Sequence, residues 1–505
     1  MRDVIKNIKI DFFDKHPRKP YILLDGRTLT SHNIIRNLII GKAANEVLSL
    51  NVGYLTKENK GSWVDCFFES YNVKPFEINS YYKNISLNEK IAFKAKSHYL
   101  ALRREKIKNI SYKNIFIGDL IYDTIVRRNK NVHTISQAPH TTLQKTIAYA
   151  FQKASAWERF LQAYNIAFMV RSHKVFVNAG VPSRIAINQK ASFLSNKRLH
   201  LRRYDTLDEI RTHEWFLPLS RIDSLVKEIG EDNLYSYAKS RFGGQAKGVD
   251  VNFAFTEKTA YTEAELRQKI GIKNKKPIAL IAPHVFSDGS YSDRDLIHED
   301  YYIWFATTLK MADNINKINW VVKPHPSASL YGEEGLVEKM VQAKNNVALV
   351  PSDVRTDSVL RLADTVITVR GTIGMEALLF DCDVIIAGNS TYEEIPCIKK
   401  CKSENSYAES IAEITNKGTV SKLDKKRALA CLYYRNKSYH LTLPELGEEV
   451  TPGMTRQEKD KINKANLVRF ARFVRYEGLE KSSFYNKMKE FFRLSKKDLS
   501  IADFT

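Results

Sequence analysis

The chain of 505 residues has little that would place it in an oxidising compartment or inside a membrane. An odd, scattered set of cysteines favours reduced thiols, and no Cys or His pair near them has zinc-finger spacing. The five are Cys66, Cys382, Cys397, Cys401 and Cys431. No apolar run approaches the roughly 18 residues that a transmembrane helix needs. Because the N-terminus is too charged for a signal peptide, we expect a cytoplasmic protein.

Acidic residues are also scarce relative to basic ones. The chain has 79 Lys and Arg against 57 Asp and Glu, which gives a net charge of +22. Such a charge implies an anionic partner, which could be nucleic acid, an anionic membrane surface or a phosphate-bearing substrate. The sequence lacks zinc-finger spacing, an RNP-type aromatic signature and basic-region heptads, so we expect no nucleic-acid partner.

The length exceeds one ordinary core and predicts two domains. A strand at "YILLDG" (21–26) precedes a helical pattern, and "NIFIGDLIYDTIVRR" (114–128) is a second strand-to-helix passage. Strands and helices alternate again from about residue 258. This alternation predicts an α/β fold with parallel sheets. Residues 230–257 are Gly-rich and polar, as in a linker or a substrate loop. We therefore predict one domain over 1–257, a second over 258–430, and a helical, basic tail over 431–505 that packs back across both.

The stretch "WVVKPHPS" (320–327) joins a buried strand to a rigid polar turn. Ligands of open α/β sheets bind beyond the carboxyl ends of the strands, and Lys323, His325 and Pro326 fall there. Two prolines leave the turn little entropy to lose when a ligand orders it. The pattern favours a phosphate site, although a histidine that caps a neighbouring backbone group would look the same.

A second stretch, "VRGTIGMEALLF" (369–380), joins another strand to a helix. Gly371 allows close approach of the backbone to a ligand, and a helix that starts near Thr372 points free N–H groups outward. Glu376 lies one turn into that helix, within reach of ribose hydroxyls if a phosphate sits at the helix start. An ordinary capped helix is the alternative interpretation.

Together, "VVKPHPS" and "TVRGTIGMEALLFDCDVIIAGNSTY" resemble the nucleotide-binding half of bacterial capsule and surface-polysaccharide glycosyltransferases, over roughly residues 275–395. These include the 3-deoxy-manno-octulosonic acid (Kdo) transferases. The resemblance implies a GT-B fold, in which two Rossmann-like domains face each other across a cleft. It also implies that His325 and Thr372 hold the phosphate of a nucleotide-sugar donor, for which a CMP-linked sugar is a candidate. The acceptor would be a growing surface polysaccharide, a lipopolysaccharide or another lipid-linked saccharide.

Three further segments resemble parts of the same enzymes: "IGDLIYDTIVRR", "SHKVFVNAGVPSRIA" and "APHVFSDGS". Through them Asp119, His173 and Asp288 become catalytic candidates that face the cleft. Glycosyl transfer needs a carboxylate or His to deprotonate the acceptor hydroxyl, or a nucleophile for double displacement. We assign Asp119 as base or electrostatic partner and Asp288 as second carboxylate, with Asp123 as a substitute for Asp119. Solvated turn aspartates or helix caps remain the plain alternative.

No metal or cofactor is expected. The D-x-D pattern of metal-dependent glycosyltransferases occurs twice in the sequence, at Asp381-Cys382-Asp383 and at Asp293-Arg294-Asp295. The first lies between a helix and the next strand, which favours a turn. The second follows a strand, where a metal is only a minority interpretation.

Other functions stay open at this stage. A polyol-phosphate transferase of teichoic-acid type or a nucleotide-sugar 2-epimerase would share the fold, and a non-catalytic scaffold or a nucleic-acid-binding protein would explain the charge. In the tail, a helix is expected over the apolar positions around Val468 and Phe473. Its basic face is a candidate for contact with anionic lipid on the inner face of the cytoplasmic membrane, as a peripheral protein. That face comprises Lys487, Lys489, Arg493, Lys496 and Lys497.

Overall fold

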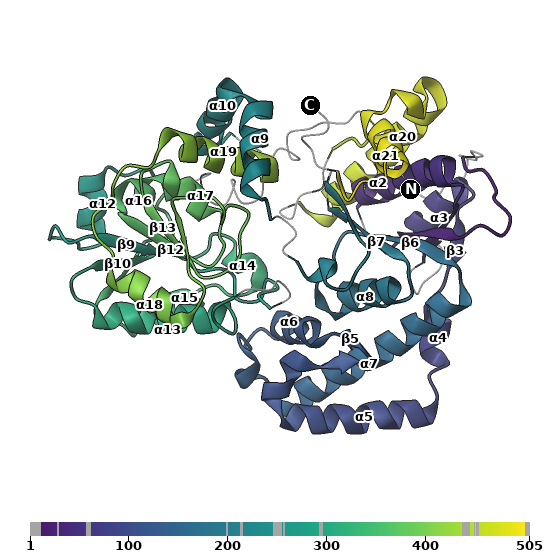
Figure 1. The fold of residues 1–505 in the computed structure, drawn as a ribbon, viewed down its shortest axis with the longest axis horizontal. Coiled ribbons are helices and arrows are strands. Elements are labelled where there is room, and N and C mark those ends of the chain that lie inside the picture. The colour runs from purple at the N-terminus through teal and green to yellow at the C-terminus, as the bar shows by residue number, and fades with distance from the viewer. Residues whose placement is uncertain are drawn as a thin grey trace. The chain divides into compact units, whose positions relative to one another are not determined.

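A computed structural model gives the fold as two compact α/β units (Figure 1). It describes residues 12–27, 30–56, 62–197, 200–212, 216–245, 255, 258–291, 296–436, 445–448, 450 and 454–499. Unit 1 comprises residues 1–122, 139–210 and 441–505, and unit 2 comprises 123–138 and 211–440. The C-terminal tail thus returns to unit 1. Among the described residues, none of the helices combines the length and the hydropathy needed to span a bilayer.

Unit 1 is built on a seven-stranded sheet in the order β15-β8-β7-β6-β1-β2-β3. Its strands are β1 (Tyr21–Asp25), β2 (Asn51–Leu55), β3 (Lys74–Phe76), β6 (Ile166–Arg171), β7 (Ser192–Lys197), β8 (His200–Tyr204) and β15 (Asp498–Leu499). The strands from β7 to β3 pair in parallel, whereas β8 and β15 add an antiparallel edge. The parallel core confirms the predicted fold class for this half.

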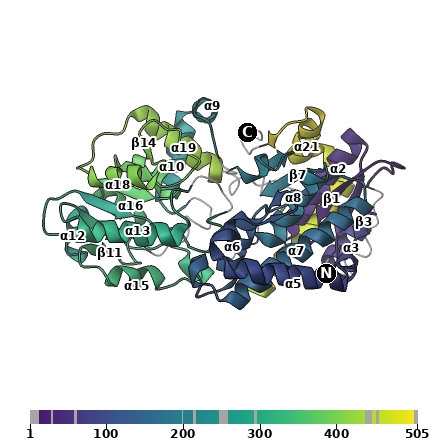
Figure 2. The same cartoon turned by 60° about the horizontal axis from the view of Figure 1, so that its bottom comes forward.

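Helices cover both faces of this sheet. On one side lie α2 (Ser31–Leu48), α20 (Arg456–Arg472) and α21 (Ser483–Arg493), and on the other lie α8 (Val181–Asn188), α7 (His140–Ala163) and α5 (Leu87–Leu102) (Figures 1 and 2). Two shorter helices, α3 (Trp63–Ser70) and α4 (Asn79–Lys83), flank β3 in sequence. The tail packs its apolar side chains, among them Leu467, Phe470 and Phe491, into the core that α2 shares with the strands.

One predicted strand belongs elsewhere. Residues 115–116 form β5 (Ile115–Phe116), which pairs antiparallel with β4 (Ser111–Tyr112) in a separate two-stranded sheet. Helix α6 (Gly118–Arg128) follows directly, and the boundary between the units falls within it. The interpretation of Asp119 as a residue beyond a parallel strand is therefore wrong, because a two-residue apolar pair can close a hairpin without joining the main sheet.

Unit 2 holds a six-stranded sheet that is parallel throughout, in the order β11-β10-β9-β12-β13-β14. The strands are β9 (Ile278–Ile281), β10 (Asn319–Val322), β11 (Val347–Leu349), β12 (Thr365–Thr368), β13 (Asp383–Ile386) and β14 (Ile398–Lys400). In chain order within the unit this is 3-2-1-4-5-6, the doubly wound Rossmann arrangement. The point at which the order reverses lies between β9 and β12.

The helices of unit 2 are α9 (Leu219–Ile229), α10 (Glu231–Phe242), α12 (Glu263–Lys269), α13 (Tyr301–Asn314), α14 (Ala328–Tyr331), α15 (Leu336–Gln342), α16 (Thr356–Leu362), α17 (Ile373–Leu378), α18 (Glu404–Ala412) and α19 (Lys422–Asn436). A capping box begins α12, since Thr262 and Glu265 bond each other's backbone N–H. The strand–helix alternation after residue 258 is confirmed.

The domain limits differ from the predicted ones. The division falls at 210/211 rather than at 257/258, and α19 belongs to unit 2 rather than to the tail. Much of the stretch expected as a linker is helix α10, whose Leu234 and Tyr237 are buried. Helices α9 and α10 both pack on α19, and Arg427 of α19 pairs with Asp223 of α9 at 2.7 Å. Because most residues of this stretch are polar, its composition does not reveal the short apolar face with which α10 packs.

Candidate functional site

A small pocket opens in unit 2 beyond the carboxyl ends of β9, β10 and β12. This is the switch point of the sheet, where doubly wound folds bind their ligands. Its volume is about 80 Å³, room for a phosphate-sized group rather than a whole nucleotide. The lining residues are Arg241, Ala282, Pro283, His284, Lys323, Pro324, His325, Pro326, Thr356, Thr368, Gly371, Thr372, Ile373 and Glu376. All six predicted donor-binding residues are among them.

Two Pro-His turns lie side by side at the mouth of this pocket. Strands β9 and β10 pair with Ile281 opposite Val322, and each strand continues into a Pro-His dipeptide at the same offset. His284 therefore lies in register with His325. The sequence motifs predict His325 but not His284, although the repeated Pro-His dipeptide after two strands is a signal for it.

The hydrogen bonds of the two imidazoles fix which ring nitrogen carries the proton. The backbone N–H of Arg370 donates to Nε2 of His284 at 3.1 Å, and that of Ser327 donates to Nδ1 of His325 at 3.3 Å. A backbone N–H can only donate, so each of these nitrogens accepts and the proton sits on the other one. Nδ1 of His284 and Nε2 of His325 are thus N–H donors on two pocket-lining residues.

The charge of His284 is controlled by its surroundings. Burial first, then electrostatic interaction with His325 and Arg370, lower its pKa well below the usual value. The ring also stacks on Tyr301, with centroids 4.5 Å apart. His284 is therefore a neutral, rigid donor, suited to an anion that it binds without giving up a proton.

Lys323 places an amine in the same pocket whose protonation changes near neutral pH. Its side chain is buried, and Nζ donates to the carbonyl of Val354 at 2.7 Å. Burial, and then the nearby Lys258, lower its pKa to about 7. A phosphate bound beside it would stabilise the ammonium form and raise the pKa again.

This coupling predicts pH-dependent binding. Above pH 7 the free site must take up a proton at Lys323 as phosphate binds, so affinity should fall by up to about tenfold per pH unit between pH 7 and 9. Calorimetric titration of UDP or CMP in buffers of different ionisation enthalpy measures the proton uptake. Lys323→Met should bind more weakly at pH 6.5 and lose the pH dependence above 7. An unchanged pH slope in that variant would remove Lys323 from the site.

Close packing shapes the third strand end. A Cβ at Gly371 would lie 2.9 Å from Oγ1 of Thr368, and one at Gly374 would lie 2.2 Å from the hydroxyl of Tyr392. That hydroxyl donates to the carbonyl of Gly371 at 2.7 Å and so fixes the turn. Thr372 makes no side-chain cap bond, which leaves its hydroxyl available to a ligand.

The helix start after Gly371 has fewer free N–H groups than the sequence predicted. Helix α17 has only six residues. The N–H groups of Gly374 and Met375 already donate to the carbonyls of Gly371 and Thr372, both at 3.0 Å. The predicted row of free N–H groups is thus shortened, because the chain enters α17 through a tight turn. The side chains around the pocket must supply most of the donors.

Glu376 reaches the pocket already bound to a cation. Oε1 accepts from Nε of Arg241 at 2.8 Å and from Nη2 at 2.5 Å, with 1% of the arginine and 4% of the glutamate side chain exposed. The arginine comes from α10, in the segment predicted to be a linker. It neutralises a carboxylate that would otherwise repel a phosphate, and it holds Glu376 in one orientation.

Of the predicted catalytic residues, Asp288 lies in the same unit as the pocket. It is exposed in the loop that follows β9, and its carboxylate bonds the hydroxyl of Tyr331. The loop is anchored by carboxylates: Asp123 accepts from the N–H of Tyr291, and Glu333 accepts from those of Phe286 and Ser287. Asp123 is therefore a structural clamp in unit 2.

Asp119 and His173 belong to unit 1. Both carboxylate oxygens of Asp119 accept from Arg184, at 2.7 and 2.6 Å, with 2% of the aspartate side chain exposed. The pair ties the start of α6 to α8. His173 is exposed in the loop after β6. Their catalytic roles remain predictions, and the ion pair at Asp119 favours a structural one.

Unit 1 has its own polar cluster, which the sequence motifs do not predict. Asp25 ends β1 and Arg171 ends the neighbouring β6, with 3.2 Å between Oδ2 and Nε. Although burial alone would raise it, the pKa of Asp25 is lowered by Arg171 and Arg27. The cluster lies at the carboxyl edge of the unit 1 sheet, where open α/β sheets bind ligands.

The described residues contain no group of three or more His, Cys, Asp or Glu side chains that could hold a metal ion. Asp381 sits in a left-handed turn with φ of 62° and accepts from the N–H of Val420 and from Lys425. This agrees with the predicted turn. Asp293 and Asp295 lie outside the described residues. All five cysteines are free thiols, as predicted.

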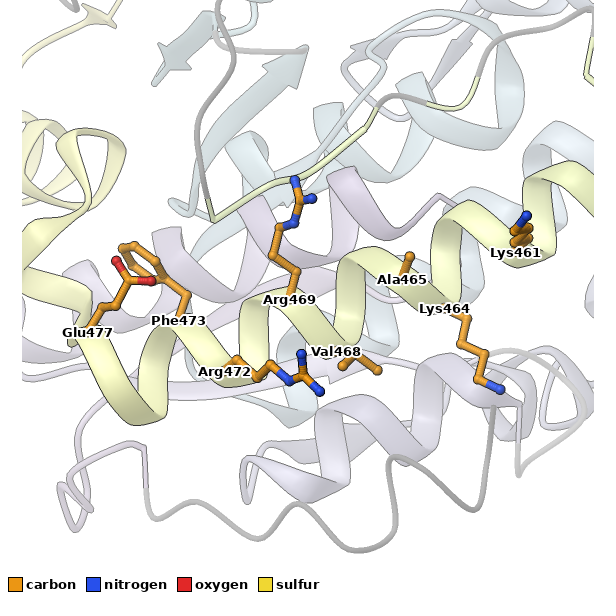
Figure 3. Close-up of a pocket in the computed structure, with 8 residues that line it drawn as sticks. All are labelled: Lys461, Lys464, Ala465, Val468, Arg469, Arg472, Phe473 and Glu477. Carbon is orange, nitrogen blue, oxygen red and sulfur yellow. The ribbon is translucent and has the colours of Figure 1, made fainter.

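A larger, shallow hollow of about 760 Å³ runs along α20 in unit 1 (Figure 3). Lys461, Lys464, Arg469 and Arg472 line it together with Ala465, Val468, Phe473 and Glu477. It lacks the strand ends, glycine turns and convergent donors of the smaller pocket. Despite its size, the chemistry therefore favours the site in unit 2.

The basic face predicted for the tail is largely neutralised within the protein. Lys487 and Lys496 pair with Glu490, Lys489 pairs with Glu46, and Lys497 pairs with Asp205 and Glu209. Only Arg493 of the five has no ion pair with a described residue. Contact of this face with lipid remains a prediction, but most of the positive charges of the face are already paired with carboxylates of the protein.

Comparison with known proteins places residues 229–400 in a match to the family model "Capsule polysaccharide biosynthesis protein". None of the curated proteins compared with the chain matches it.

Among solved structures, the chain is similar to KpsC, a beta Kdo 2,4 transferase of Thermosulfurimonas dismutans, at 13% identity over 53% of this chain and 79% of that one, with a TM-score of 0.32. It is similar to the UDP-GlcNAc 2-epimerase of Methanocaldococcus jannaschii at 11% identity over 82% of this chain and 98% of that one, TM-score 0.26. The epimerase of Neisseria meningitidis matches at 11% identity over 92% and 100%, TM-score 0.20.

The family match spans the whole pocket, from Arg241 to Glu376. It confirms the predicted resemblance to capsule polysaccharide biosynthesis proteins, over the residues 229–400 that hold the motifs.

Proposed function

We propose that this protein is a glycosyltransferase that moves a sugar from a nucleotide-sugar donor to a growing surface polysaccharide or lipid-linked saccharide. The observation that carries the proposal is the pair of in-register Pro-His turns at the switch point of unit 2. They present two imidazole N–H donors beside Lys323 and Thr372, a set suited to a phosphate that becomes more negative as it leaves. The capsule-family match over the same residues supports it.

In the transfer step, the bond between the anomeric carbon and the donor phosphate breaks, and a bond from that carbon to the acceptor oxygen forms. The acceptor proton passes to a base, and the electron pair of the broken bond stays on the phosphate. His284, His325 and Lys323 stabilise that charge without a metal in the proposed scheme. Glu376 would bond the donor ribose. Addition of EDTA should leave turnover unchanged.

The two carboxylates proposed for catalysis should respond differently to substitution. Asp288→Asn should lower turnover by about a hundredfold or more if Asp288 accepts the acceptor proton, and leave the fold intact because the side chain is exposed. Asp119→Asn should instead lower the free energy of unfolding by about 3–5 kcal/mol, since it strips a buried arginine of its counterion. Turnover and urea unfolding of both variants test this. Normal turnover in Asp288→Asn would remove Asp288 from catalysis.

A thermal-shift screen against CMP, CDP, UDP and GDP, followed by calorimetry, tests the proposed function. A ligand that binds only the folded state raises the melting temperature, so the ranking identifies the base. Stabilisation by one nucleotide, reversed in His325→Ala, supports a donor site. Absence of binding to all four, with the protein folded, would contradict the proposal.

The alternatives give different outcomes. A polyol-phosphate transferase of the same fold would favour CDP and release CMP with the phosphate transferred, and a 2-epimerase would convert its UDP-sugar without an acceptor. A nucleic-acid-binding protein would be displaced from nucleotide resin by DNA. A scaffold could bind nucleotide but would show no turnover.

A further inference from the structure

Helix α5 carries apolar side chains on two faces. The inner face packs on α7: Phe93 stacks with Phe151 at 5.8 Å between centroids, and Glu89 is held by Arg159. The outer face exposes four large side chains, Leu87 at 72%, Ile91 at 58%, Tyr99 at 50% and Leu102 at 65%.

These four residues form one stripe. They lie four, eight and three residues apart in sequence, so all point to one side of the helix, where the exposed residues Ala95, Asn88 and His98 lie between them. Single exposed apolar residues are ordinary on protein surfaces, whereas four large ones gathered on one helix face indicate an interaction surface. Figures 1 and 2 show α5 as the outermost helix on the α7 side of unit 1.

The charges beside the stripe are almost all positive. Lys90 and Lys94 flank it on one edge and Lys96 on the other, and the helix's only acid, Glu89, is turned inward. Residues 83–108 together hold eight Lys or Arg against two Glu. Arg103 also stacks over Tyr99, with 4.7 Å from Cζ to the ring centroid. A basic rim around an apolar stripe, with an aromatic side chain at its end, is the pattern of a helix that lies in a membrane interface.

We propose that the outer face of α5 docks unit 1 onto an anionic lipid bilayer, with Leu87, Ile91, Tyr99 and Leu102 inserted among the acyl chains and the lysines on the headgroups. A second copy of the chain would complement the stripe but would bring the lysines of the two helices together. Anionic lipid matches both features. This surface is on the opposite side of the unit 1 sheet from α20 and the tail lysines (Figure 1), so one flat membrane engages only one of them.

Vesicle flotation of the full-length chain tests the proposal. The protein should float with vesicles of phosphatidylcholine and phosphatidylglycerol, and much less with phosphatidylcholine alone or at high salt. The variant Leu87→Gln, Ile91→Gln, Leu102→Gln should lose at least about tenfold in vesicle affinity, because apolar insertion adds to the electrostatic attraction. The double variant Lys90→Gln, Lys94→Gln should weaken binding to the anionic vesicles but not binding to vesicles of phosphatidylcholine alone.

The matched control is Lys461→Gln, Lys464→Gln, Arg472→Gln on the hollow of α20, which should float like the parent. Loss of flotation in this control, or unchanged flotation of the α5 variant, would overturn the proposal. So would a concentration-dependent dimer that the α5 variant disperses, since it would show a second copy on the stripe. The melting temperature without ligand should be the same in all variants, which confirms that each is folded and separates this test from that of the proposed function.

Discussion

Replacing Arg241 with methionine is expected to lower the free energy of unfolding by about 3–5 kcal/mol, the cost of leaving a buried charge without its partner. The partner is Glu376, and 4% of its side chain is exposed. The lone carboxylate would also face the pocket, so nucleotide affinity should fall together with stability. Urea unfolding and calorimetric titration of the variant measure both effects.

The double variant Arg241→Met, Glu376→Gln separates charge from packing. It should recover much of the lost stability and part of the nucleotide affinity, because no uncompensated charge remains. Arg221→Met is the matched control, since Arg221 pairs with Glu228 at the same 2.5 Å but with 35% and 46% of the two side chains exposed. Its cost should stay below about 1 kcal/mol. A single variant no worse than this control, or a double no better than the single, would contradict the account.

The sequence predicted the parallel sheet of unit 2 and its functional edge because both arise from local patterns. Buried strands such as Ile278–Ile281 end in polar turns, and parallel strands bring those turns to one edge. His284 also follows the carboxyl end of a parallel strand, but the motif "APHVFSDGS" that contains it predicts Asp288 instead. A comparison of the residues after each strand, rather than of each motif alone, finds it.

Other features needed the structure because no local pattern encodes them. Arg241 is 135 residues from Glu376 in sequence, and only the packing of α10 brings them together. Asp119 was misplaced because Ile115 and Phe116 look the same in a hairpin as in a sheet. In α5, periodicity could show two apolar faces, but not which of them the protein buries.

The two histidines of the pocket give the last prediction. His325→Ala should weaken nucleotide binding by about 1.5–3 kcal/mol, the range for a hydrogen bond to a charged group. Turnover should fall further, because charge on the phosphate grows toward the transition state. Stability should change little, since the half-buried imidazole is absent from the apolar core of the unit. Calorimetry of UDP or CMP and thermal unfolding measure these effects.

Amide isosteres test the tautomers as well as the contacts. The amide nitrogen of glutamine can occupy the place of Nε2 and that of asparagine the place of Nδ1. Because His325 donates from Nε2 and His284 from Nδ1, His325→Gln and His284→Asn should keep part of the affinity. His325→Asn and His284→Gln should lose about as much as alanine. Equal affinities within each pair would mean that neither ring donates to the nucleotide, and the Pro-His turns would then be structural.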